Sequence, residues 1–194
     1  GEKAFCAGGD VLRICLGVRE NGIEDPYAQK FFTQEYKLDY LIHTFPKPVI
    51  VWGHGIVMGG GIGLMCGASH RVVTESSRLA MPEITIGLYP DVGGSYFLSR
   101  LPGRLGLFLG MTGVNINAAD ALYAEFADHA VASGRRQAVI DALAELDWAQ
   151  DDAGCRAQVS AVLDAEECPG MPVSELQHRV AQINERAASD ELPV

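Results

Sequence analysis

The stretch PVIVWGHGIVMGGGIGLMCGAS, residues 48–69, decides the fold. It contains no Asp, Glu, Lys or Arg, and seven of its 22 residues are glycine. Its length would suffice to cross a bilayer, but so many glycines, together with Pro48 and His54, argue against a membrane helix. Residues 49–52 are continuously apolar, which is typical of a strand buried on both faces of a sheet. We therefore expect a buried strand, a glycine loop and a buried helix.

The segments around this stretch alternate between helical and extended patterns. Asp25 and Pro26 predict an N-cap followed by proline at the first helical position. Apolar residues then recur with helical spacing as far as Phe45, and the prolines at 46 and 48 end the helix. Alternating helices and strands around a glycine loop predict the α/β class. The other expected elements are strands at 71–74 and 78–82, short helices over 93–120 and a helical region after 131.

Composition and charge limit the classes of partner. With 194 residues, 48% of them hydrophobic, the chain can bury the core of one globular domain. The net charge is −10, and residues 101–194 carry six Lys and Arg against fifteen Asp and Glu, which argues against nucleic acid or an anionic membrane surface as partner. Five scattered cysteines without a C-x-x-C pair predict a reducing compartment. Because the chain opens without Met, we expect an excerpt of a longer protein.

The glycine loop does not fit three familiar loops. A dinucleotide fingerprint starting at Gly61 would need glycine at Cys66, and a P-loop needs a Gly-Lys pair that this sequence lacks. A serine-hydrolase elbow starting at Gly67 fails at Arg71. Two uses remain open, which are close helix–strand packing and an oxyanion hole that binds a carbonyl oxygen through backbone N–H groups.

Five motifs in order carry a family resemblance. They are AFCAGGD at 4–10, FFTQEY at 31–36, MGGG at 58–61, MPE at 81–83 and PDVGG at 90–94. Together they resemble the crotonase (enoyl-CoA hydratase/isomerase) superfamily over residues 1–131, and within it the 3-hydroxyisobutyryl-CoA hydrolases. The resemblance implies a spiral of ββα units. It also implies a crotonase-like core at 1–130, whose first strands lie upstream, and an incomplete helical C-terminal region at 131–194.

The resemblance also implies an active site. The N–H groups of Gly9 and Gly60 would form the oxyanion hole for a thioester, and Glu83 and Asp91 would be the catalytic acids. Hydratases of the superfamily carry a glutamate at the position of Gly63, and hydration needs two carboxylates across the double bond. The departure at Gly63 therefore favours hydrolysis of a short 3-hydroxyacyl-CoA, namely 3-hydroxyisobutyryl-CoA in valine catabolism. The implied substrate-binding residues are Glu35, Gly60, Glu83 and Asp91.

Alternatives stay open at each of these positions. The protein could be another crotonase-type isomerase or hydratase, or a non-catalytic acyl-CoA-binding relative. Asp91 is also suited to cap the following helix, and Glu83 to lie on the surface. Glu35, on the apolar row of the predicted helix, either sits at the edge of that row or points into a pocket. We expect Cys6 and Cys66 to be small buried hydrophobic residues and not nucleophiles. We also expect a structural role for four histidines, namely His43, His54, His70 and His129.

The expected ligands follow from the same resemblance. Coenzyme A arrives as part of the acyl-CoA substrate, so we expect no separate cofactor and no metal. Lys3, Arg13 and Lys47 are candidate neighbours of its phosphates. A homo-oligomer is also expected. The expected location is the cytoplasm of a bacterium or the mitochondrial matrix of a eukaryote.

Overall fold

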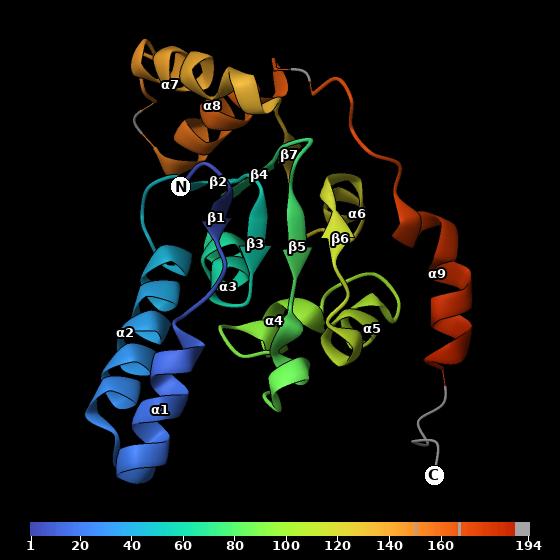
Figure 1. Cartoon of the computed structure of the whole chain (residues 1–194). Coiled ribbons are helices and arrows are strands. Elements are labelled where there is room, and N and C mark those ends of the chain that lie inside the picture. The colour runs from blue at the N-terminus through green and yellow to red at the C-terminus, as the bar shows by residue number, and fades with distance from the viewer. Residues whose placement is uncertain (150, 167, 189–194) are drawn as a thin grey trace.

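The computed structural model describes residues 1–149, 151–166 and 168–188 (Figure 1). Two small sheets form its centre, and all their strand pairs are parallel except β5–β6. The first sheet has the order β1 (Ala4–Cys6), β3 (Ile56–Met58), β5 (Arg78–Ala80) and β6 (Ile116–Asn117). The second has the order β2 (Ile50–Gly53), β4 (His70–Val73) and β7 (His129–Ala130).

From β1 to β5, successive strands alternate between the two sheets. The chain passes from β2 to β3, through a helix to β4, and on to β5, so each turn adds one strand to each sheet. This is the ββα spiral that the resemblance implies, and the α/β fold class is confirmed. The division into a core at 1–130 and a C-terminal region stays a prediction. Residues 189–194 of that region lie outside the described residues.

Helices surround the sheets (Figure 1). Near the N-terminus are α1 (Val11–Asn21), the 3-10 turn η1 (Gly22–Glu24) and α2 (Pro26–His43). In the middle of the chain are α3 (Gly60–Gly67), the 3-10 helix η2 (Pro82–Ile86), α4 (Gly94–Leu98), α5 (Leu105–Thr112) and α6 (Ala118–Tyr123). The C-terminal part holds η3 (Ser133–Arg135), α7 (Arg136–Ala144), α8 (Asp152–Asp164) and α9 (Glu175–Arg186). In Figure 1, α7 and α8 lie at the top and α9 at the right.

The glycine-rich stretch 48–69 forms β2, β3 and α3. The expected strand and helix are confirmed, but the expected loop contains β3, because Gly55, at φ +57°, turns the chain between two strands. Val57, Ile62 and Met65 of this stretch are fully buried in the main core. No helix of the described residues is long and apolar enough to span a bilayer.

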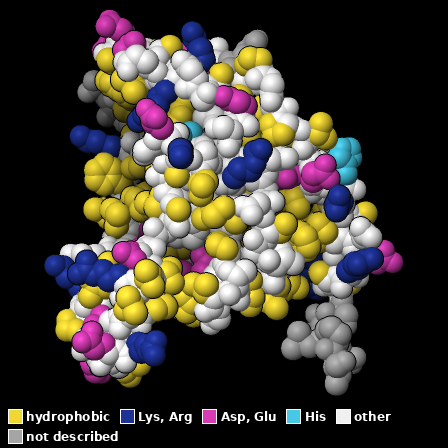
Figure 2. All heavy atoms as spheres, in the orientation of Figure 1, with side chains coloured by type: hydrophobic (Ala, Val, Ile, Leu, Met, Phe, Trp, Pro, Cys, Tyr) yellow, Lys and Arg dark blue, Asp and Glu magenta, His cyan; other side chains and the backbone are white. Residues whose placement is uncertain are grey.

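Two further details differ from the sequence-based expectation. The predicted helix starts where expected, because Asp25 accepts a hydrogen bond from the Ala28 N–H at 2.8 Å, but it ends at His43, before the prolines. Helix α1 was not expected. Most of its apolar residues are exposed, including Leu12 at 71%, and none is buried, so the helix lacks the buried face that an apolar pattern would indicate. In Figure 2, hydrophobic and charged side chains mix over the lower left of the molecule, where α1 and α2 lie in Figure 1.

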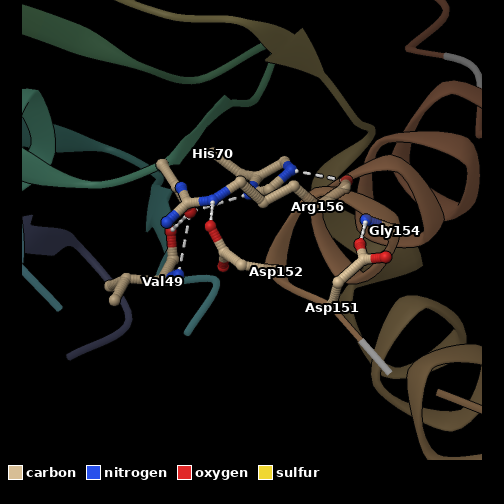
Figure 3. Close-up of polar contacts among 7 residues, drawn as sticks. Val49, His70, Asp151, Asp152, Gly154 and Arg156 are labelled. Carbon is tan, nitrogen blue, oxygen red and sulfur yellow. Dashed lines mark hydrogen bonds and ion pairs between the residues drawn. The ribbon is translucent and has the colours of Figure 1, made fainter. Parts of the chain in front are cut away.

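A buried histidine joins α8 to the central sheets (Figure 3). The Nδ1 of His70 lies 2.9 Å from the Ser69 hydroxyl, and its Nε2 lies 3.0 Å from the Arg156 carbonyl of α8. Burial lowers the pKa of His70, which favours the neutral ring. The ring of His129 stacks on it, and His129 Nδ1 contacts Asp164 at 2.7 Å. These contacts agree with a structural role for both histidines.

A substitution at Gly61 tests how α3 packs on β1. A Cβ at this position would overlap the backbone carbonyl of Cys6. We expect Gly61→Ala to lower the free energy of unfolding by about 1–3 kcal/mol, measured by urea denaturation, because a backbone cannot yield as a side chain can. Gly134→Ala is the control, since a Cβ there meets nothing within 4 Å. Equal stabilities of the two variants would contradict this packing.

Candidate active site

Two glycine turns meet at the start of α3. A Cβ added to Gly8, at φ +89°, would lie 3.5 Å from the Met58 carbonyl oxygen and 3.6 Å from the Gly60 nitrogen. Gly9 follows Gly8, and Gly60 opens α3, where the first N–H groups lack partners within the helix. The two glycines that the resemblance implies for an oxyanion hole are therefore neighbours. Their role stays a prediction.

Helix α2 brings Glu35 to the same place. A Cβ added to Gly67 would lie 3.3 Å from Cγ2 of Ile42, so glycine lets α2 pack closely on α3. The half-buried Glu35 directs its Oε1 against Gly60, where a Cβ would overlap it. Glu35 therefore points toward Gly60 and does not sit at the edge of the apolar row.

Glu83 follows Pro82 in η2 and lies beside Gly59, at the turn that opens α3. Its side chain is 6% exposed, so the surface alternative is wrong. Its Oε1 lies 3.0 Å from where a Cβ of Gly59 would be. Its Oε2 is buried and has no hydrogen-bond partner among the described residues. Such a group indicates a ligand or a reacting atom that would complete its bonding.

Asp91 is held by a tyrosine of α2. Its Oδ2 accepts a hydrogen bond from the Tyr36 hydroxyl at 2.7 Å. The capping alternative is wrong, because α4 begins after Gly93 and receives no side-chain cap. The next residue, Val92, is buried and has φ +43°, an unfavourable conformation for a β-branched residue. Strain of this kind concentrates at functional turns.

Asp39 is a fourth carboxylate, which the sequence analysis missed. It lies one helical turn after Glu35, and both its carboxylate oxygens are buried without a partner among the described residues. The signal that could have found it is the i, i+4 spacing from Glu35 on one helix face.

Burial and the repulsion between like charges raise the pKa values of Glu35, Asp39 and Glu83. Burial, and then the charges of Asp91 and Asp39, raise the pKa of Glu35 to about 7. Burial, followed by the charge of Asp91, raises the pKa of Asp39 to about 6. Burial is also the main cause that raises the pKa of Glu83, and Asp91 adds to it. Groups with such pKa values can exchange protons near neutral pH, as acid–base chemistry requires.

A cavity of about 420 Å³ opens beside Asp91. Tyr36, Asp39 and His43 of α2, Cys66 of α3 and the segment around Asp91 line it, whereas Glu35, Gly60 and Glu83 do not. The His43 ring packs edge-on to Tyr96, with centroids 5.6 Å apart. Burial raises the pKa of Cys66 to about 12, which keeps this thiol protonated and suits its interpretation as a small hydrophobe.

The three candidate cations do not line the cavity beside Asp91. Arg13 stacks its guanidinium over the Tyr27 ring at 3.9 Å, while Lys3 precedes β1 and Lys47 follows α2. Their role toward coenzyme A phosphates stays a prediction. Within the described ranges, no group of three or more His, Cys, Asp or Glu side chains is arranged to hold a metal ion.

The profile of the family described as enoyl-CoA hydratase/isomerase matches residues 1–193. The chain belongs to this family. A 3-hydroxyisobutyryl-CoA hydrolase of Xenopus tropicalis, described as mitochondrial, is 49% identical over 133 residues, which are 69% of this chain and 34% of that protein. The small ribosomal subunit protein mS47 of Neurospora crassa is 43% identical over 75% of this chain and 29% of its own length.

Solved structures confirm the fold. The crystal structure of a carnitinyl-CoA dehydratase from Mycobacterium thermoresistibile matches with a TM-score of 0.82 and 39% identity. The match covers 99% of this chain and 52% of that one. The chain spans about a third of the length of the curated relatives described above.

The raised pKa of Glu35 predicts a pH-dependent stability. The folded state favours the protonated carboxyl, so the wild type loses stability as the pH rises from about 4.5 to about 7. Relative to wild type, we expect Glu35→Gln to gain at least about 1 kcal/mol between pH 4.5 and pH 8, after allowance for solvent screening. Urea denaturation at both pH values measures this gain. The same stability difference at both would refute it.

Proposed function

We propose that the full-length protein hydrolyses the thioester of a short 3-hydroxyacyl-CoA, namely 3-hydroxyisobutyryl-CoA, as in valine catabolism. The observation that carries this proposal is the Glu83 carboxylate, which is buried, lacks a partner at Oε2 and lies against the glycine turn that opens α3. A carboxylate in this place can activate water next to a carbonyl bound by backbone N–H groups.

In the proposed reaction, the thioester oxygen binds between the N–H groups of Gly9 and Gly60. Glu83 takes a proton from water while the water oxygen attacks the carbonyl carbon, and the negative charge moves to the bound oxygen. When the tetrahedral intermediate collapses, the C–S bond breaks and the electron pair leaves with the coenzyme A thiolate, which takes up the proton. Attack by Glu83 itself, through an anhydride that water then opens, balances equally and is the alternative route.

Asp91 would bind the 3-hydroxyl group of the substrate or position Glu83. The hydrogen bond from Tyr36 supports either role, because it fixes one carboxylate oxygen and leaves the other free to accept. Asp91 also lines the cavity, which offers room for an acyl group. Glu35 would complete the acidic wall around the substrate.

A hydratase or dehydratase is the second candidate, favoured by the likeness to the carnitinyl-CoA dehydratase. The surroundings of Gly63 argue against it. This residue is buried, and a Cβ there would lie 2.5 Å from Cβ of Val92, so the second acid of hydratases has no room at this position. The third candidate, a non-catalytic acyl-CoA-binding relative, leaves the buried, unpartnered Glu83 without a purpose.

The remaining expectations belong to the same proposal. Acyl-CoA is the partner, its coenzyme A portion is part of the substrate, and no further cofactor is needed for the steps above. Homo-oligomerisation stays a prediction. We propose a reducing compartment, either the cytoplasm of a bacterium or the mitochondrial matrix of a eukaryote.

Release of free coenzyme A tests the proposal. With the full-length protein and 3-hydroxyisobutyryl-CoA, thiol release is followed with a disulfide reagent. We expect Glu83→Gln to lower kcat about 10²–10⁴-fold, because the base is lost, and Asp91→Asn to lower kcat/KM at least tenfold. Glu145→Gln, an exposed change on the C-terminal side of α7, serves as the matched control.

The result also separates the candidates. Release that persists in Glu83→Gln would refute the assigned base. A change of enoyl-CoA absorbance without thiol release would move the protein to the hydratase or isomerase branch. Binding of acyl-CoA without either change would favour the non-catalytic relative.

A further inference from the structure

Asp39 is a buried carboxyl that the proposed reaction does not use. Both its carboxylate oxygens are shielded from solvent and have no hydrogen-bond partner among the described residues. The residue lies one turn after Glu35 on α2, and it lines the same cavity as Asp91. An ionised carboxylate in such a place is costly unless it is paired or hydrogen-bonded, so a buried group of this kind indicates a functional role.

Ionising Glu35, Asp39 and Asp91 at the same time would cost free energy, because three like charges would lie close together. Asp91 receives the hydrogen bond from Tyr36, whereas neither Glu35 nor Asp39 takes part in a hydrogen bond or ion pair within the described residues. The charges that act on Glu35 are those of the two aspartates, and both have the same sign as its own. Carboxyls arranged in this way retain a proton among them.

The position of Glu35 shows which carboxyl should hold this proton. Its Oε1 lies against Gly60, whose N–H group would bind the oxyanion of the proposed reaction. A negative charge on Glu35 would repel that oxyanion. A protonated Glu35 would avoid the repulsion and could donate a hydrogen bond of its own.

We propose that Asp39 is a positioning residue whose negative charge keeps Glu35 protonated beside Gly60, so that Glu35 faces the oxyanion as a neutral donor. The inference rests on the proposed hydrolase function. The directions of the pKa shifts agree with it: burial, then Asp91 and then Asp39 raise the pKa of Glu35, whereas Glu35 is not among the causes that raise the pKa of Asp39.

Other titratable groups also face Asp39, and the test must distinguish their effects on the Glu35 titration from the effect of Asp39. Burial and Asp91 hold the pKa of Tyr36 above its usual value, and burial raises that of Cys66 to about 12, so neither group titrates near neutral pH. The variant His43→Gln removes the neighbouring imidazole. The remaining groups around the cavity and beside Glu35 are Tyr40 of α2, Glu83 of η2, Tyr89 and Asp91 of the following segment and Tyr96 of α4.

The test compares Asp39→Asn with wild type in the full-length protein. Carbon-13 NMR follows the titration of the Glu35 carboxyl, assigned through Glu35→Gln, and thiol release gives kcat/KM against pH. We expect the Glu35 midpoint in Asp39→Asn to move about 0.5 pH unit lower, because burial and Asp91 raise the pKa of Glu35 more than Asp39 does. The alkaline limb of kcat/KM should move with it, because Glu35 then ionises earlier. Asp39→Glu, which retains the charge, should restore both, and Glu145→Gln should change neither.

Two results would overturn the inference. One is an unchanged Glu35 midpoint in folded Asp39→Asn, and the other is a lowered midpoint with an unmoved pH profile. If wild type releases no thiol at all, the hydrolase proposal fails by itself. The NMR titration then still decides whether Asp39 controls the charge of Glu35. If His43→Gln moves the profile as far as Asp39→Asn does, the effect belongs to the imidazole and the assignment to Asp39 is wrong.

Discussion

The close approach of two glycine turns is the constraint on which the rest of this structure depends. Gly8, at φ +89°, lies in contact with Met58 and Gly60, and Gly61 lies so close to the carbonyl of Cys6 that a Cβ would overlap it. Strand β1 can therefore pair with β3 while α3 begins directly beside it. The same approach sets Gly60 against the turn that holds Gly8 and Gly9, and the proposed chemistry needs this placement.

A second close approach supplies the acids. Gly67 lets α2 pack on α3, which brings Glu35 to Gly60 and Asp39 to the cavity. Few favourable partners offset this concentration of carboxylates, and the buried core has to compensate for its cost. Active sites commonly contain groups with raised pKa values that lower the stability of the fold.

Local patterns predicted some elements of the fold and not others. The cap at Asp25, the apolar run of β2 and the glycine-rich start of α3 are local signals, and all three elements formed. Helix α1 and strand β3 were missed, since α1 has no buried face and β3 has only three residues between glycines. The ordered motifs predicted Glu35, Glu83 and Asp91 as site residues, and their roles stay a prediction. The motifs did not reveal Asp39 or the bond from Tyr36 to Asp91, because both depend on how α2 packs against segments distant in sequence.

The central claim is that the paired glycine turns bind a thioester oxygen. The most direct measurement is a crystal structure of full-length Glu83→Gln with 3-hydroxyisobutyryl-CoA bound. We expect the thioester oxygen to lie about 2.7–3.1 Å from the nitrogens of both Gly9 and Gly60. A thioester bound elsewhere, or an oxygen that contacts neither nitrogen, would contradict the account.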